Sequence, residues 1–309
     1  MLFRPSPIVC AKKPSSTLWL ARQARDPYVR LRSSPHPSAG GVAYRSRSAF
    51  KLLEMNDKWA MRFLDYPDVR VVLDLGSAPG GWSQVAARKL GWDPQPARMR
   101  EAKTPYPRAD GSDGDRGTGS WSARARPPSR DDDLPANANP VDISDLENHA
   151  GGTGGMGLGR GTIIAVDLLR MTPIPGVQFI QADFLAPDTE ELIRSIIAHR
   201  TGDGDDAKAD VVLCDMAANL TGTHYHDMEA SLTICTSVLE FCKRHMRSAE
   251  SIGRQLGGVL LMKHFVHPAL HVFRTEILAT RFTDVRFLKP HASRPESNEG
   301  YFICRGWKS

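Results

Sequence analysis

The strongest constraint on the fold is a short apolar run that leads directly into a glycine-rich turn. Residues 71–75 (VVLDL) are followed by Gly76, and then by Gly80 and Gly81, after which a helical pattern begins. Glycines in such a turn let backbone N–H groups and a ligand approach closely at a helix N-terminus. The spacing is neither the dinucleotide-binding GxGxxG pattern nor the phosphate-binding GxxxxGK[ST] loop, which argues against hydride transfer and nucleotide hydrolysis.

The same alternation of apolar runs and helical spacing continues along the chain, and it predicts one fold class. Short apolar runs indicate strands, whereas apolar residues three and four positions apart indicate helices. This order predicts a doubly wound, Rossmann-like α/β domain, with a mainly parallel sheet and helices on both faces. We expect strands over residues 69–75, 162–167, 177–182, 210–215, 258–263, 284–288 and 301–305, and helices over residues 83–90, 189–199, 228–246 and 269–280.

Three of the later strands end in an acidic residue, namely Asp167, Asp183 and Asp215. The carboxyl ends of parallel strands meet at one edge of a sheet, where carboxylates can accept hydrogen bonds from ribose hydroxyls and from an adenine amine. A carboxylate there also offsets the positive charge of a sulfonium, so S-adenosylmethionine fits this edge. Each acid taken singly is equally compatible with a helix N-cap or a turn.

Positive charge is concentrated at the start of the chain. Residues 1–50 hold nine Lys and Arg against one acid, Asp26, while the rest carries 31 basic and 34 acidic residues. Residues 1–25 lack any acid and mix Arg, Lys and Ser with hydrophobic residues, which is typical of an organelle transit peptide. We therefore expect a mitochondrial transit segment or disordered basic arm over residues 1–40, followed by a catalytic domain over residues 41–309. A plain basic tail is the alternative.

One segment interrupts this domain. Residues 93–160 are rich in Pro, Gly, Asp, Ser and Arg, with too little apolar surface to offset the entropy of ordering. We expect a disordered insertion, and contact with RNA or a ribosome is its functional alternative. The five cysteines form no CxxC pair, which argues against a zinc site and a disulfide framework, so we expect no metal. No run approaches the roughly 18 apolar residues of a membrane span.

Three motifs together resemble one known family. Residues 44–52 (YRSRSAFKL), 74–83 (DLGSAPGGWS) and 214–219 (CDMAAN) look like the FtsJ (RrmJ) family of ribose 2′-O-methyltransferases, over residues 44–307 outside the insertion. The resemblance implies an S-adenosylmethionine-dependent enzyme. Its catalytic tetrad falls on Lys51, Asp215, Lys263 and Glu299, and its cofactor contacts fall on Gly80, Trp82, Asp167, Asp183 and Asp215. One departure is Ala218, where the family usually has proline.

The chemistry implied by this resemblance is a proton-coupled methyl transfer. A ribose 2′-hydroxyl is a poor nucleophile, so the enzyme must align it with the methyl group and remove its proton. Lys263 is the candidate base, and electrostatic steering of the oxygen by Lys263 remains an alternative. Basic residues expected to contact RNA phosphates are Arg45, Arg47, Lys51, Lys58, Arg62 and Arg294.

The resemblance also implies a substrate. We expect a uridine of mitochondrial large-subunit ribosomal RNA, bound as free RNA or within an assembly intermediate. A tRNA 2′-O-methyltransferase of the same family and a ribosome-assembly factor that mainly binds pre-rRNA are the alternatives.

Overall fold

The computed structural model describes residues 24–33, 43–58, 61–92, 159–204, 207–217, 224–266 and 268–309. Most of the expected arm, residues 93–158 of the expected insertion, and Ala218 lie outside these ranges.

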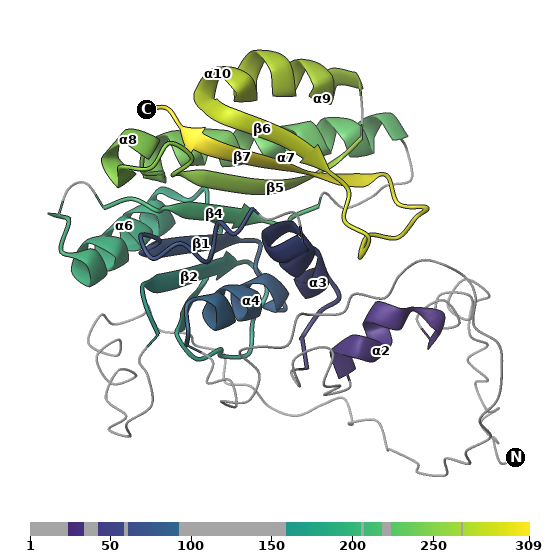
Figure 1. The fold of residues 1–309 in the computed structure, drawn as a ribbon, viewed down its shortest axis with the longest axis horizontal. Coiled ribbons are helices and arrows are strands. Elements are labelled where there is room, and N and C mark those ends of the chain that lie inside the picture. Colours follow the sequence, from purple (N-terminus) through teal and green to yellow (C-terminus); the bar gives the residue numbers. More distant parts are fainter. Residues whose placement is uncertain are drawn as a thin grey trace, which may run out of the picture. The chain divides into compact units, whose positions relative to one another are not determined.

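A seven-stranded sheet forms the centre of the domain (Figure 1), in the order β3-β2-β1-β4-β5-β7-β6. The first five strands run parallel, and β7 runs antiparallel to both of its neighbours. The expected doubly wound, mainly parallel sheet is therefore confirmed. The strands are β1 (Val71–Leu75), β2 (Thr162–Asp167), β3 (Val177–Gln181), β4 (Val211–Cys214), β5 (Val259–Phe265), β6 (Phe282–Leu288) and β7 (Glu299–Trp307).

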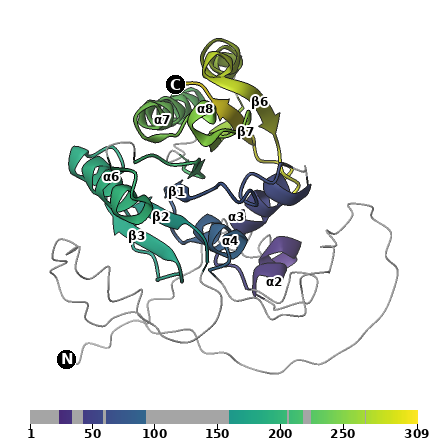
Figure 2. The same ribbon diagram turned by 60° about the vertical axis from the view of Figure 1, so that its left-hand side comes forward.

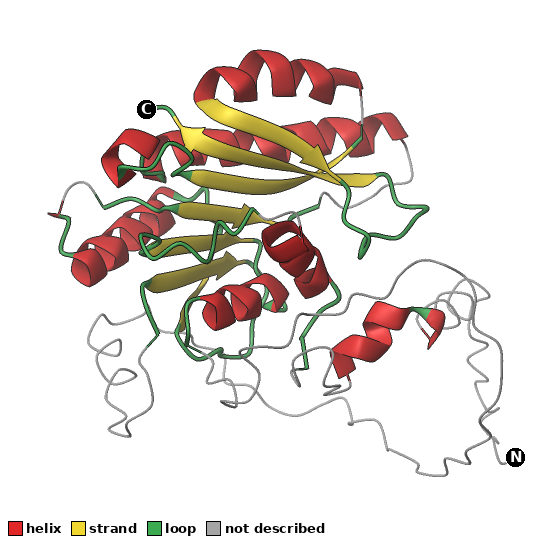
Figure 3. Ribbon diagram, in the orientation of Figure 1, coloured by secondary structure: helices red, strands yellow, loops and turns green. Residues whose placement is uncertain are grey.

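Helices cover both faces of the sheet, as Figures 1 and 2 show. On one face lie α3 (Ser48–Leu53), which continues into the π-helical segment η2 (Glu54–Lys58), and α4 (Gly81–Lys89). On the other lie α6 (Pro187–Thr201) and α7 (His224–His245), followed by the short α8 (Ala249–Ile252). Between β5 and β6, the helix expected over residues 269–280 consists of α9 (Pro268–Val272), the π-helical η5 (Phe273–Leu278) and α10 (Ala279–Arg281) (Figure 3).

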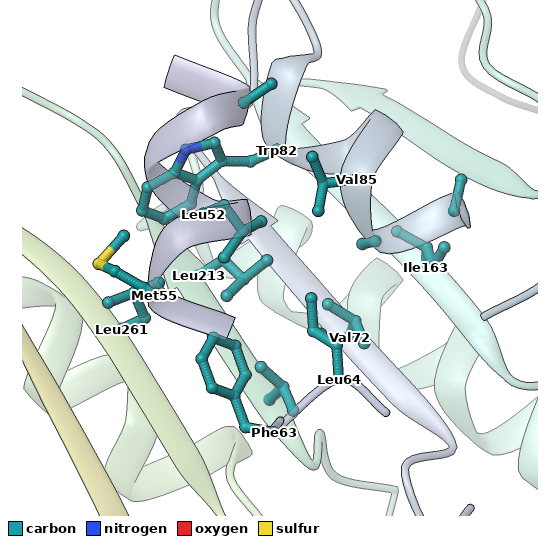
Figure 4. Packing of buried hydrophobic residues seen from close by; sticks show 14 of the residues in the cluster. Leu52, Met55, Phe63, Leu64, Val72, Trp82, Val85, Ile163, Leu213 and Leu261 are labelled. Atoms are coloured by element: carbon teal, nitrogen blue, oxygen red, sulfur yellow. The ribbon is translucent and has the colours of Figure 1, made fainter. Parts of the chain in front are cut away.

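Apolar side chains fix α3 against the sheet (Figure 4). Leu52 and Met55 are fully buried, and they belong to the same cluster as Trp82 of α4. Burying each such side chain contributes about 1.5–3 kcal/mol, so the position of this short helix is set by packing. The strand residues of this cluster include Val72, Ile163, Leu213 and Leu261.

Part of the range that we expected to form an arm is folded. Residues 27–33 form α2 (Pro27–Ser33), in which Tyr28 is 8% exposed and its ring centroid lies 5.5 Å from that of Phe50. Leu31 packs against the same core cluster. The average composition of the first 40 residues is that of an arm, but these apolar side chains give α2 a surface to bury.

No helix within the described ranges is long and apolar enough to cross a membrane.

Candidate active site

The glycine-rich turn lies at the carboxyl edge of the sheet, between β1 and α4. Gly76 and Gly80 have φ angles of 70° and 105°, which favour glycine. A Cβ atom on Gly76 would lie 2.0 Å from Cγ of Met216, and one on Gly80 would lie 2.8 Å from Cδ1 of Ile174. No larger residue fits either position, so the turn brings its backbone close to whatever occupies this edge. Gly80 also precedes the first turn of α4, whose N–H groups have no helical acceptor.

Of the acids expected to bind the cofactor, Asp167 contacts this turn and Asp183 follows β3 at the carboxyl end of that strand. Asp167 accepts hydrogen bonds from the backbone N–H groups of Ala78 (2.8 Å) and Leu169 (2.7 Å), and thereby ties the end of β2 to the glycine turn. Asp183 is exposed, and one of its oxygens accepts from the N–H of Leu185 at 3.0 Å. Each of these acids thus also shapes its own turn.

Trp82 packs helices together. Its indole N–H donates to the carbonyl oxygen of Ser48 on α3 at 2.9 Å, and its side chain is buried. The indole ring therefore packs α4 against α3 and against the Tyr301 ring.

The four residues expected to carry the chemistry come together from four elements. Lys51 of α3 forms a 2.7 Å ion pair with Glu299, the first residue of β7. Lys263 of β5 lies 3.5 Å from Asp215, which directly follows β4, and 3.8 Å from Glu299. Glu296, by contrast, is exposed and belongs to no described ion pair. The antiparallel register brings Lys263 close to Glu299, because Phe265, two residues after Lys263 on β5, is the direct partner of Glu299 on β7.

Tyr301 connects the Lys51–Glu299 pair to the Lys263–Asp215 pair, and the sequence did not point to it. The ammonium of Lys51 donates to the Tyr301 hydroxyl at 3.1 Å, and this hydroxyl donates to Asp215 at 2.7 Å. Its ring is buried, with its centroid 5.8 Å from that of Trp82. Tyr301 is the direct cross-strand partner of Lys263, a relation that becomes visible only once β7 is known to be antiparallel to β5.

The surroundings of Glu299 and Tyr301 favour a charged carboxylate and a neutral phenol. Burial raises the pKa of Glu299, but the ammonium groups of Lys51 and Lys263 outweigh this and hold that pKa below its usual range. Burial raises the pKa of Tyr301 well above its ordinary value, and the charges of Asp215 and Glu299 add to this effect. The tyrosine therefore remains a hydrogen-bond donor to Asp215 at physiological pH.

Two of the arginines expected to contact phosphates are engaged within the protein. The guanidinium of Arg45 donates to the carbonyl oxygens of Thr172 and Pro173. Arg47 pairs with Asp26 and donates to the carbonyl oxygen of Ala292. Of the other residues in that group, Arg62 is exposed, Arg294 lies 4.0 Å from Asp26, and the side chain of Lys58 lies outside the described part.

Within the described ranges, no group of three or more His, Cys, Asp or Glu residues could hold a metal ion. The cysteines of these ranges, Cys214, Cys235, Cys242 and Cys304, are free and buried. Cys10 lies outside them.

A family model for FtsJ-like methyltransferases matches residues 44–115 and 116–307. The chain belongs to this family. As an FtsJ-like methyltransferase it is an S-adenosylmethionine-dependent RNA ribose 2′-O-methyltransferase.

Relatives of this FtsJ-like methyltransferase cover almost its whole length. A protein named ribosomal RNA large subunit methyltransferase E from Afipia carboxidovorans is 33% identical over 297 residues, 96% of this chain and 91% of that protein. A protein of the same name from Rhodopseudomonas palustris is 31% identical, over 96% of this chain and 86% of that protein. The fold is shared with a Plasmodium falciparum protein whose crystal structure is described as a ribosomal RNA methyltransferase (TM-score 0.51, 20% identity, covering 85% of this chain and 98% of that one).

The residues at the carboxyl edge fit S-adenosylmethionine, the methyl donor of the family. Leu168 and Leu169, directly after Asp167, are 67% and 68% exposed and would offer apolar surface to the purine ring of the cofactor. Asp167, Asp183 and the backbone of the glycine turn would hold the cofactor's polar groups. The bound cofactor supplies a methyl group on a positively charged sulfur, which makes that methyl electrophilic.

The cluster of lysines and carboxylates can then orient and activate a hydroxyl group. Lys263 is 13% exposed and holds longer ion-pair distances than Lys51 does, so of the two lysines its ammonium is the better placed to meet a substrate oxygen. Lys263 would stabilise negative charge that develops on that oxygen, and its contacts with Asp215 and Glu299 would fix the direction of its side chain.

Proposed function

We propose that this FtsJ-like methyltransferase methylates the ribose 2′-hydroxyl of a uridine in mitochondrial large-subunit ribosomal RNA, and that it thereby supports ribosome biogenesis. The observation that carries the proposal is the joining of Lys51, Lys263, Asp215 and Glu299 at the same sheet edge as the glycine turn. The names of the relatives, ribosomal RNA large subunit methyltransferase E, support the choice of large-subunit RNA.

The mitochondrial part of the proposal is supported by the composition of the first residues. Residues 1–25 contain no acid and several arginines and lysines. An acid-poor segment that mixes Arg, Lys and Ser with hydrophobic residues is typical of transit peptides. In mitochondria, the substrate is then the organelle's own large-subunit RNA or an assembly intermediate that contains it.

The experiment that tests the proposal is a ribose-methylation map of mitochondrial rRNA, cytosolic rRNA and cytosolic tRNA in cells that lack the protein. We expect the loss of one uridine mark in the mitochondrial large-subunit RNA. Wild type should restore it, Lys263→Ala should reduce methylation by at least about a hundredfold, as removal of an acid–base group does, and Lys308→Ala, an exposed lysine, should restore it fully.

The other outcomes contradict the proposal in distinct ways. Loss of a mark only in tRNA would place the enzyme in the tRNA-directed branch of the family. Unchanged marks in all three pools, together with a ribosome-assembly defect that Lys263→Ala repairs, would assign the main role to RNA binding.

A further inference from the structure

The N-terminal helix α2 contacts the active-site elements through two side chains. The hydroxyl of Tyr28 donates to Oε1 of Glu54 at 3.3 Å, and its ring packs on Phe50. Asp26, directly before α2, forms an ion pair with Arg47, whose guanidinium carbon also lies 5.3 Å from the centre of the Tyr28 ring. The helix therefore holds both Arg47, before α3, and Glu54, after it.

Arg47 and Glu54 in turn hold the backbone of a single residue, Ala292. Nε of Arg47 donates to the carbonyl oxygen of Ala292 at 2.8 Å, and the N–H of Ala292 donates to Oε2 of Glu54 at 3.2 Å. Ala292 and Glu54 are both fully buried. Both backbone groups of Ala292 thus depend on side chains that α2 fixes.

Ala292 belongs to the segment 289–298, which leads into Glu299. Within it, the ammonium of Lys289 donates to the carbonyl oxygens of Pro295 (3.1 Å) and Ser297 (2.8 Å), so the segment is tied to itself as well. Glu299 pairs with Lys51, which lies between Arg47 and Glu54 along α3. The contacts of α2 therefore reach the Lys51–Glu299 pair by two routes. One runs through α3, which carries Lys51, and the other through the segment 289–298, which leads into Glu299.

We propose that α2 is a positioning element of the active site. Asp26 and Tyr28 fix Arg47 and Glu54, these two fix Ala292, and the Lys51–Glu299 pair is held in place as a result. Loss of the Tyr28 hydroxyl leaves an oxygen of a fully buried carboxylate without its donor, which favours rearrangement of Glu54 and of the Ala292 backbone that it holds. This positioning role depends on the proposed function only in the experiment that measures methyl transfer to rRNA.

The test compares Tyr28→Phe with Tyr44→Phe. Both rings pack against Phe50, with centroids 5.5 Å and 5.3 Å away, and both variants remove one hydroxyl. The Tyr44 hydroxyl, however, accepts from Arg88 of α4, whereas the Tyr28 hydroxyl donates to Glu54. Asp26→Asn is a second variant, which keeps the side-chain size and removes the charge that pairs with Arg47.

Three quantities are measured: amide hydrogen exchange in the segment 289–298, the dissociation constant of S-adenosylmethionine, and kcat on large-subunit rRNA. For Tyr28→Phe and Asp26→Asn we expect exchange about fivefold faster and kcat about fivefold lower, the size expected for one lost hydrogen bond. Cofactor affinity should stay within about twofold, because neither residue contacts the glycine turn. Tyr44→Phe should leave the exchange of 289–298 and kcat unchanged.

Two results would overturn the proposal: unchanged exchange in both α2 variants, or equal effects of Tyr28→Phe and Tyr44→Phe. A wild-type enzyme that does not methylate rRNA would refute the proposed function alone, because hydrogen exchange and cofactor binding are measured without RNA.

Discussion

The hydroxyl of Tyr301 links Lys51 to Asp215 and so connects the Lys51–Glu299 pair to the Lys263–Asp215 pair. Because it accepts from Lys51 and donates to Asp215, we expect Tyr301→Phe to lower kcat about tenfold, the effect of about one hydrogen bond within a charged network. The ring remains against Trp82, so the dissociation constant of S-adenosylmethionine should not change. Steady-state kinetics and a cofactor titration measure both.

The control for this variant is Tyr66→Phe, since Tyr66 is 38% exposed and its ring faces Arg254 rather than the tetrad. An unchanged kcat in Tyr301→Phe would mean that the hydroxyl does not orient Lys51 or Asp215.

Asp74 gives the fold a dependence on pH. It is 1% exposed and accepts from the Ser83 hydroxyl at 2.5 Å, and burial raises its pKa from 3.8 to about 7. Between about pH 4 and pH 7 the unfolded chain has lost this proton while the folded chain keeps it, so the free energy of unfolding falls as pH rises through this window. Above about pH 7 Asp74 is charged in both states, and the free energy of unfolding has fallen by the full amount that this group causes.

Asp74→Asn should therefore reduce this fall, and its stability relative to wild type should increase from pH 4.5 to pH 7.5. Urea denaturation at several pH values measures the difference. Glu229→Gln, at an exposed position of α7, is the control for removal of one carboxyl group. A difference in stability between Asp74→Asn and wild type that does not change with pH would contradict the prediction, because it would mean that the Asp74 carboxyl titrates alike in the folded and unfolded chains.

Single residues also show what the sequence could predict about the site. Lys51, Asp215, Lys263 and Glu299 were found through motifs, and the structure brings them together. Tyr301 could not be found, because its role depends on the register of an antiparallel strand pair. The roles of Arg45 and Arg47 were also not predictable, because composition does not show whether an arginine binds an RNA phosphate or a carbonyl oxygen of its own chain.

At the scale of elements, buried strands were predicted best. The residues of β1 and β4 are buried throughout, so these strands read as apolar runs that only Asp74 of β1 interrupts. The ends of strands were less certain, and β7 begins two residues before its apolar run, at Glu299. Helix α2 was missed because a single turn or two of apolar side chains is outweighed by the basic composition around it.

The two ends of the predicted insertion meet at the edge opposite the active site. The N–H of Arg160 donates to the carbonyl oxygen of Leu90 (2.8 Å), just after α4, and its guanidinium donates to the carbonyl oxygen of Leu64 (2.8 Å), ahead of β1. Trp92 lies against Gly159, where a Cβ atom would be 2.5 Å from the indole. Residues 94–158 themselves lie outside the described ranges.

Because these ends are already adjacent, we expect a short Gly-Ser linker in place of residues 94–158 to preserve folding, and to keep kcat and cofactor affinity within about twofold. Circular dichroism measures folding, methyl transfer to rRNA measures kcat, and a cofactor titration measures affinity. As a control, the same linker in place of residues 290–296 should abolish activity. A folded deletion variant with lost activity would instead assign the insertion a role in binding RNA.

At the scale of the whole molecule, the proposed mitochondrial targeting and the position of α2 constrain each other. The acid-free segment ends at Arg25, and Asp26 directly precedes the helix whose Tyr28 is buried against Phe50. Cleavage after Tyr28 would remove both contacts that hold Arg47 and Glu54. The targeting information must therefore lie before the first residue that the folded domain uses.

We accordingly expect the mature protein isolated from mitochondria to begin at or before Asp26, as measured by mass spectrometry of its terminal peptide, and a reporter fused to residues 1–23 to be imported. The same reporter with its arginines and lysines changed to glutamine should remain in the cytosol, because import of such segments depends on their positive charge. A fully active mature chain that starts beyond Tyr28 would contradict the positioning role of α2, whereas a cytosolic reporter would refute the targeting proposal and leave the chemistry of the site untouched.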